Sequence, residues 1–223
     1  MIKVEKIDVW GFEHAIRGMR NPLNSWDKSD SEWRVYTPEY PHLSEAKYEI
    51  GPNDLDLMRR LYKAGPEHRK YLRQIFVSMD ITAPLYLWKE ADTYKVGTVA
   101  NSCSTMHKIH AKEFELDDFS HEHLVAGLST LEYVIDVMNI ARNVYLKSKS
   151  KEDWWQIIQL LPSSYNQKRT ICMSYETVFK IIRERTGHKL DEWNDFVELL
   201  RQELPYVREI VEDNDDLSKM SKQ

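Results

Sequence analysis

The chain has 223 residues, of which 42% are hydrophobic, so it is long and apolar enough to form one substantial core. Its 31 Lys and Arg against 36 Asp and Glu give a formal net charge of -5, which excludes the basic surface that broad nucleic-acid binding requires. The two cysteines, Cys103 and Cys172, are too few for a disulfide framework and are typical of a reducing compartment.

The N-terminal residues alternate charged and apolar side chains, and they contain neither a signal-peptide core nor a long uncharged run. We therefore expect a soluble, cytoplasmic protein with no membrane partner. Residues 1–212 are predicted to form a single α+β domain, and residues 213–223 a polar, frayed tail.

The first quarter of the chain is predicted to contain one strand followed by a long loop. Residues 2–12 alternate, imperfectly, between apolar and polar side chains and predict a first strand. Residues 17–41 contain several prolines, including Pro38 and Pro41, and predict a loop with at most a short strand at 33–36.

A helix, a strand and a second helix are predicted next. Asn53 or Asp54 can cap a helix whose apolar residues recur at helical spacing, and Gly65 stands where a left-handed stop is expected. Residues 71–81 predict a strand, and the Ala83-Pro84 pair suits the first turn of a following helix because proline lacks a donor there.

The second half of the chain is predicted to be helical. Apolar residues of 121–147 trace one stripe, which predicts a long amphipathic helix. Shorter helices are predicted at 154–161, 175–185 and 190–204.

The segment 81–108 leads from an apolar entry into a turn rich in short polar side chains. These groups supply donors and acceptors at close range, as an anionic ligand requires. We therefore predict a ligand site here. The side chains concerned are Thr93, Thr98, Asn101, Ser102, Cys103, Ser104 and Thr105, beside Lys89, Glu90, Asp92 and Lys95.

Cys103, His107 and His110 offer two alternative kinds of chemistry. Their spacing of four and three would place thiol and imidazoles on one helix face, as a zinc site requires, with His121 and His123 as further ligands. Cys103 assisted by His107 could instead be a nucleophile. A small packed cysteine explains the same residues, and our prediction contains no metal.

Arg183 and Arg185 end the helix predicted at 175–185, where cations are stabilised by the helix dipole. That structural role would account for both residues. An arginine at a helix end is equally well placed to grip a planar ring edge or a phosphate with its fork of donors.

Two stretches resemble the flavin-dependent thymidylate synthases. Ile81-Thr-Ala-Pro-Leu-Tyr86, then Thr93-Tyr94-Lys95, seven residues and Cys103-Ser104-Thr105, is similar to that family's Ala-Pro entry followed by Arg-His-Arg, seven residues and Ser-Gly-Arg. The second stretch has Leu161-Pro162, a helix ending at Arg185, and Glu192-Trp193, where the family has a Leu-Pro turn, a helix ending in arginine and a Gln-Trp-Glu.

This resemblance implies a fold, an assembly and a reaction. The fold would be α+β, a mixed sheet flanked by helices with a helical C-terminal half, assembled as a homotetramer whose active sites are shared between subunits. The reaction would be reductive methylation of dUMP, with FAD carrying hydride from NADPH and methylenetetrahydrofolate giving the carbon. Arg185 would be the catalytic arginine that lies against the pyrimidine.

Several positions depart from the family signature. Thr93 and Tyr94 stand in place of an arginine and a histidine, and Lys95 keeps a charge without the bidentate fork. Glu90 replaces a glutamine, and Thr105 replaces the arginine that grips phosphate. Each lost charged contact weakens mononucleotide binding by about 1.5–3 kcal/mol.

We therefore predict a pocket for a nucleotide-like anionic ligand on a thymidylate synthase-like scaffold, with or without the methylation reaction. The alternatives are a catalytically inactive oligomeric binding or assembly protein on the same scaffold and, from a different class, a zinc-dependent hydrolase. The predicted ligand-binding residues are Glu90, Thr93, Tyr94, Lys95, Cys103, Ser104, Thr105 and Arg185.

Overall fold

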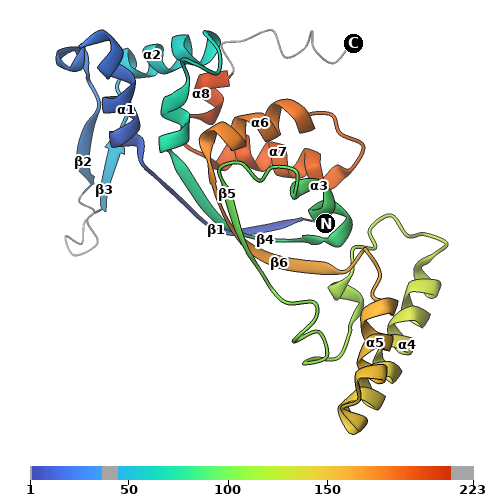
Figure 1. Ribbon diagram of the computed structural model, residues 1–223. Helices are drawn as coiled ribbons and strands as arrows, with labels where there is room; N and C mark the ends of the chain where they lie inside the picture. The colour runs from blue at the N-terminus through green and yellow to red at the C-terminus, as the bar shows by residue number, and fades with distance from the viewer. Residues whose placement is uncertain (1, 37–44, 212–223) are drawn as a thin grey trace.

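The structure is a computed structural model that describes residues 2–36 and 45–211 (Figure 1). The predicted tail at 213–223 and the prolines Pro38 and Pro41 lie outside the described residues. The elements in chain order are β1 Lys3–Trp10, α1 Phe12–Arg20, β2 Glu32–Tyr36, β3 Glu45–Glu49, α2 Pro52–Lys63, β4 Phe76–Pro84, α3 Leu85–Ala91, β5 Thr98–Ser102, α4 Leu128–Ser148, α5 Lys151–Leu160, β6 Asn166–Ser174, α6 Tyr175–Arg185, α7 Asp191–Glu203 and α8 Val207–Val211.

The central sheet has the strand order β1-β4-β6-β5. All of its described pairings are antiparallel, whereas the family resemblance implied a mixed sheet. The longest pairing joins β4 to β6, from Phe76 opposite Ser174 to Pro84 opposite Asn166. Strands β2 and β3 form a separate two-stranded sheet, which lies at the opposite end of the molecule from α4 and α5 (Figure 1). The predicted α+β class is confirmed.

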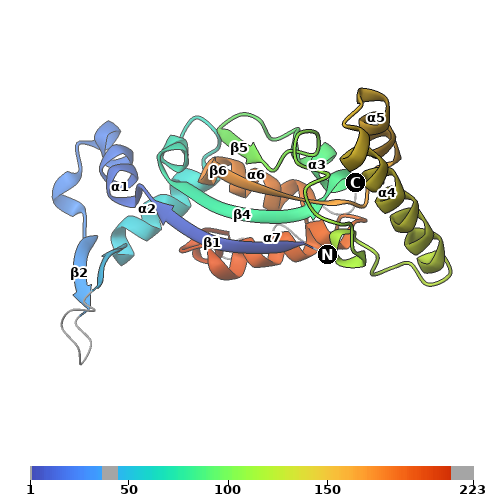
Figure 2. The ribbon, with the colours of Figure 1, turned by 90° about the horizontal axis from the view of Figure 1, so that it is seen from below.

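One face of the sheet carries the main core. Along β4 the side chains of Val77, Met79, Ile81 and Ala83 are buried, and the alternate residues are only half-buried, as the period of a strand requires. Helices α3, α6 and α7 supply Leu87, Ile182, Trp193 and other side chains to the same cluster. Figure 2 shows α6 and α7 lying along one side of the sheet. This packing fixes the position of each helix end.

The predicted helices agree closely with the structure, and the largest difference is at the beginning of α4. Helix α6 spans the predicted residues, and α7 differs by one residue at each end. Helix α4 begins at Leu128 rather than at residue 121, because the segment before Gly127 folds into turns. The residue that caps α2 is Gly51 rather than Asn53 or Asp54.

Four elements, α1, β4, β5 and β6, were missed or shifted. Helix α1 occupies residues expected to be strand and loop, and β4 begins at Phe76 because Lys70–Gln74 forms a 3-10 helix. The end of the predicted polar turn, Thr98–Ser102, is the edge strand β5. The central strand β6 was not predicted, because its first half, Asn166–Thr170, is entirely polar.

Asp54 is buried as the centre of a hydrogen-bond network instead of capping α2. Its Oδ1 accepts from Nε of Arg20 at 2.6 Å, and its Oδ2 accepts from the hydroxyls of Ser29 and Ser31, each at 2.7 Å. Backbone N–H groups of Asp30 and Ser31 also donate to Oδ2. Burial raises the pKa of Asp54, but these hydrogen bonds outweigh burial and hold the pKa below its usual value.

Helices α4 and α5 form a hairpin that projects from the sheet, as both ribbon views show (Figures 1 and 2). The hairpin has a small core of its own, formed by Ile109, Phe114, Phe119, Leu131, Ile135, Met138 and Ile157. No helix within the described residues has both the length and the apolar character needed to cross a membrane.

Candidate functional site

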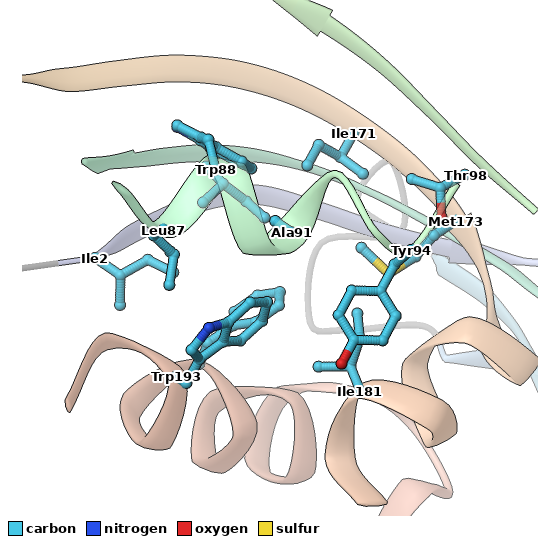
Figure 3. Close-up of a pocket in the computed structure, with 12 residues that line it drawn as sticks. Ile2, Leu87, Trp88, Ala91, Tyr94, Thr98, Ile171, Met173, Ile181 and Trp193 are labelled. Atoms are coloured by element: carbon cyan, nitrogen blue, oxygen red, sulfur yellow. The ribbon is translucent and has the colours of Figure 1, made fainter. Parts of the chain in front are cut away.

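An apolar cavity lies between helix α3, the buried face of the sheet and helix α7 (Figure 3). The centre of a water-sized molecule can reach about 30 Å³ of it, so the cavity is narrow. Ile2, at the start of the chain, lines it together with residues of α3, β6 and α7. Two hydroxyl side chains, Tyr94 and Thr98, border it, and the buried Oγ1 of Thr98 has no hydrogen-bond partner among the described residues. The cavity therefore offers an apolar wall with few polar groups.

Arg185 joins α3 to α6 and α7 beside this cavity. Its Nε donates to the hydroxyl of Tyr94 at 2.8 Å, and its Nη1 donates to Oε2 of Glu90 at 2.7 Å. The indole N–H of Trp193 donates to the same Glu90 oxygen at 3.0 Å. Nε2 of His188 lies 3.1 Å from Nη1 of Arg185 and 3.4 Å from Oε2 of Glu90. We call these five residues the Arg185 cluster.

The guanidinium of Arg185 also packs against the aromatic rings of Tyr94 and Trp193. The Cζ atom of Arg185 lies 4.7 Å from the ring centroid of Trp193 and 5.4 Å from that of Tyr94. The rings of Tyr94 and Trp193 meet edge to face at 6.0 Å. Nζ of Lys180 lies 5.5 Å from the Tyr94 centroid. Burial raises the pKa of Tyr94, and the nearby Arg185 opposes that rise.

Secondary structure explains why these side chains meet. Glu90 lies in the last turn of α3, Arg185 is the last residue of α6, and Trp193 lies in the first turn of α7. Cations are stabilised at a helix C-terminus, so the position of Arg185 is electrostatically favourable. Ser174 caps the start of α6 by accepting from the N–H of Thr177, which fixes the direction of that helix.

The arrangement has unused hydrogen-bonding capacity. Nη2 of Arg185 makes no hydrogen bond within the described part of the chain, while Nε and Nη1 are both engaged. The side chain of Arg185 is 16% exposed and that of Glu90 37% exposed. A guanidinium held on two sides can present its remaining donor to a planar or anionic group without further ordering.

A second arginine, Arg169, which the sequence reasoning missed, lies over Trp88, one of the residues that line the cavity. Nη1 of Arg169 donates to Asp92 at 2.7 Å, Nε donates to Gln167 at 3.0 Å, and the guanidinium lies 4.3 Å from the Trp88 ring centroid. Gln167 donates in turn to the carbonyl of Cys103 at 2.7 Å. Arg169 belongs to β6, the strand that was not predicted, so its place beside Trp88 had no sequence signal.

The remaining predicted ligand residues lie outside the Arg185 cluster, although Thr93 contacts the backbone of one of its members. Thr93 donates its hydroxyl to the carbonyl of Glu90, and Lys95 is exposed. Cys103 is exposed just after β5, and the hydroxyl of Ser104 accepts from two backbone N–H groups of its own turn. No contact among the described residues joins Cys103, Ser104 or Thr105 to the cluster.

The helix face on which the zinc alternative was based is not present in the structure. Residues 103–110 form turns rather than a helix, so Cys103, His107 and His110 do not share a helix face. Within 2–36 and 45–211, no group of three or more His, Cys, Asp or Glu is placed to hold a metal. His110 packs against the ring of Tyr145 at 4.9 Å, and burial, helped by nearby lysines and an arginine, lowers its pKa.

Comparison with solved structures identifies the fold. One crystal structure of thymidylate synthase X from Helicobacter pylori with FAD and dUMP is 16% identical, with 96% of this chain and 98% of that chain covered and a TM-score of 0.66. The chain therefore has the fold of the flavin-dependent thymidylate synthases, as the resemblance implied.

A second structure gives the same result. It is a flavin-dependent thymidylate synthase from Helicobacter pylori complexed with FAD and dUMP, 17% identical, with 94% and 99% of the two chains covered and a TM-score of 0.63. No protein-family model matches the chain. No curated protein sequence matches it either.

The Arg185 cluster by itself supplies only part of what an FAD site needs among the described residues. A flavin dinucleotide carries a pyrophosphate as well as its ring, and phosphate recognition relies on several cationic or backbone donors. The described cations over the rings of the Arg185 cluster are Arg185 and Lys180, and two bonds of Arg185 are internal. This arrangement fits one anionic group beside a planar ring.

Proposed function

We propose that this chain is a flavin-dependent thymidylate synthase-like protein that binds a nucleotide-like anion at the Arg185 cluster. The observation that carries the proposal is the guanidinium held over the Trp193 ring, with Nη2 left for a ligand. Tyr94 and Glu90 fix the orientation of that guanidinium before a ligand arrives. Such preorganisation lowers the entropy lost on binding.

The proposed ligand is a mononucleotide or a molecule of similar shape. Its planar base would contact the apolar wall and Nη2 of Arg185, and Lys180 would contribute positive charge beside Tyr94. The solved structures with this fold contain dUMP and FAD. We propose self-association into a homotetramer whose subunits share each site, which would bring further phosphate donors to the Arg185 cluster. We propose a cytoplasmic location, which the low cysteine content supports.

The first candidate function is FAD-dependent methylation of dUMP, with NADPH and methylenetetrahydrofolate as co-substrates. The second candidate is ligand binding without catalysis, which the position of Glu90 favours. Its carboxylate occupies Nη1 of Arg185 at 2.7 Å, so part of the positive charge that a substrate would use is already neutralised. The two candidates share the ligand pocket and differ in the reaction.

The first test is a thermal-shift screen of the purified chain against dUMP, other nucleotides, folates and FAD. A ligand that binds only the folded state raises the apparent stability by about 2.7 kcal/mol at a hundred times its Kd. We expect saturable stabilisation by at least one nucleotide. A complete lack of response across the panel would contradict the proposal.

The second test separates the two candidates. Visible absorption of the chain after incubation with FAD reports flavin binding, and dUMP-dependent oxidation of NADPH reports the reaction. Nucleotide stabilisation without flavin binding or turnover would identify a binding protein. Flavin binding together with turnover would identify an active thymidylate synthase.

A further inference from the structure

The two oxygens of the Glu90 carboxylate have different surroundings. Oε2 accepts from Nη1 of Arg185 at 2.7 Å and from the indole N–H of Trp193 at 3.0 Å. Nε2 of His188 lies 3.4 Å from the same oxygen. That nitrogen carries the ring proton, because Nδ1 of His188 accepts from the backbone N–H of Leu190 at 3.1 Å. Three N–H groups therefore face Oε2.

The other oxygen of Glu90 is free to meet a ligand. Oε1 makes no hydrogen bond within residues 2–36 and 45–211, and the same holds for Nη2 of Arg185. Both atoms are open to solvent, because the only buried side-chain polar atoms without a partner in that part of the chain belong to Thr98, His110 and Glu176. Each is two covalent bonds from the contact between Nη1 and Oε2, so one nucleobase can span both. The site therefore presents one donor beside one acceptor.

We propose that Oε1 of Glu90 accepts a ring N–H of the ligand's base, while Nη2 of Arg185 donates to a carbonyl oxygen next to that N–H. This inference rests on the proposed function, because it concerns the same ligand site. The ligand class that it names is a nucleotide with a lactam edge on its base. Uracil has such an edge, with N3–H between two carbonyl groups, so either carbonyl can meet Nη2.

Glu90 determines specificity in this arrangement because an ionised carboxylate accepts hydrogen bonds and cannot donate them. A ring N–H opposite Oε1 is stabilised by a hydrogen bond to a charged group. A phosphate group, which carries negative charge, is repelled from the same position. Arg185 and Glu90 together therefore select the base of the nucleotide rather than its phosphate.

The donors around Oε2 determine how an amide would behave at position 90. The guanidinium of Arg185 and the indole of Trp193 can only donate, so in Glu90→Gln the amide oxygen must take the place of Oε2. The amide NH2 group then takes the place of Oε1 and presents a donor where the wild type presents an acceptor. The substitution therefore reverses the hydrogen-bonding character of one atom and keeps the size of the side chain.

Calorimetric titration of the full chain with dUMP and with N3-methyl-dUMP tests the wild type. The methyl group removes the N3–H, so we expect its Kd to be about tenfold higher than that of dUMP, or more. Equal Kd values would overturn the inference and leave the proposed function standing, since the nucleotide still binds. A wild type that binds other nucleotides but not dUMP would also overturn only the inference. A lack of response to every nucleotide would overturn both.

Glu90→Gln distinguishes hydrogen bonding from steric exclusion of the methyl group. We expect the ratio of the two Kd values to fall close to one, because N3–H then meets a donor and loses its advantage. The matched control is Glu198→Gln, the same change in a surface arginine pair on α7, which should keep the wild-type ratio. An unchanged ratio in Glu90→Gln would overturn the inference, since steric exclusion would then explain the preference. The melting temperature without ligand reports folding, and the wild-type titration decides the question if Glu90→Gln does not fold.

Discussion

Two arginine–carboxylate pairs in this molecule have the same chemistry but different surroundings. Arg20 and Asp54 meet at 2.6 Å and are 5% and 0% exposed, while Arg185 and Glu90 meet at 2.7 Å and are 16% and 37% exposed. Asp54 accepts five hydrogen bonds inside the fold, whereas Arg185 lies on aromatic rings beside a cavity. Burial, rather than distance, therefore separates a pair that holds elements together from a pair that can meet a ligand.

The largest expected effect follows from breaking the buried pair. Asp54→Ala leaves the charge of Arg20 buried without its carboxylate partner, and we expect the free energy of unfolding to fall by about 3–5 kcal/mol in urea denaturation. The control is Asp56→Ala on the same helix. Asp56 pairs with Arg60 at the surface, so its removal should change stability by less than about 0.5 kcal/mol. Equal effects of the two substitutions would contradict the distinction.

Breaking the partly exposed pair should affect binding more than folding. We expect Arg185→Ala to abolish stabilisation by a nucleotide, while the melting temperature of the empty protein stays within a few degrees of the wild type. Arg183→Ala is the control, since this arginine lies two residues earlier on α6 and contacts only Glu184 among the described ion pairs. A large loss of stability in Arg185→Ala alone would identify Arg185 as structural instead.

The smallest expected effect is that of His110 on the pH dependence of stability. Burial lowers the pKa of His110, and Lys149, Lys108 and Arg142 lower it further. Because the folded state binds this proton more weakly than the unfolded state, His110 reduces stability as the pH falls below about 6.5. We expect the wild type to lose slightly more melting temperature between neutral pH and pH near 5.5 than His110→Gln does. Parallel melting curves for the two proteins would refute this role.

Much of the fold was predictable where a local pattern reflects a buried face. Helix α6 has apolar side chains at helical spacing and Ser174 as its cap, so its limits were predicted correctly. Strand β6 was missed because its polar residues find partners only in the folded molecule. Lys168 pairs with Asp80, for example, and Arg169 lies over Trp88.

The candidate site was predictable in part for the same reason. The family resemblance pointed to Glu90, Tyr94 and Arg185, which do lie in contact. The segment around Cys103 was grouped with them because it is rich in short polar side chains and falls in the same stretch of the resemblance. Strand β5 separates the Cys103 segment from the Arg185 cluster. Thr98, at the start of β5, pairs with Met173, whereas Ser102, at its end, pairs with Arg169, four residues away along β6.

The place of Ile2 in the cavity wall has a practical consequence for protein production. Strand β1 follows directly at Lys3, so the side chain of the second residue already borders the candidate pocket. A purification tag or fusion partner joined ahead of Ile2 would begin beside this opening and could compete with a small molecule for it. Affinity measurements on tagged material should therefore be repeated after the tag has been cleaved.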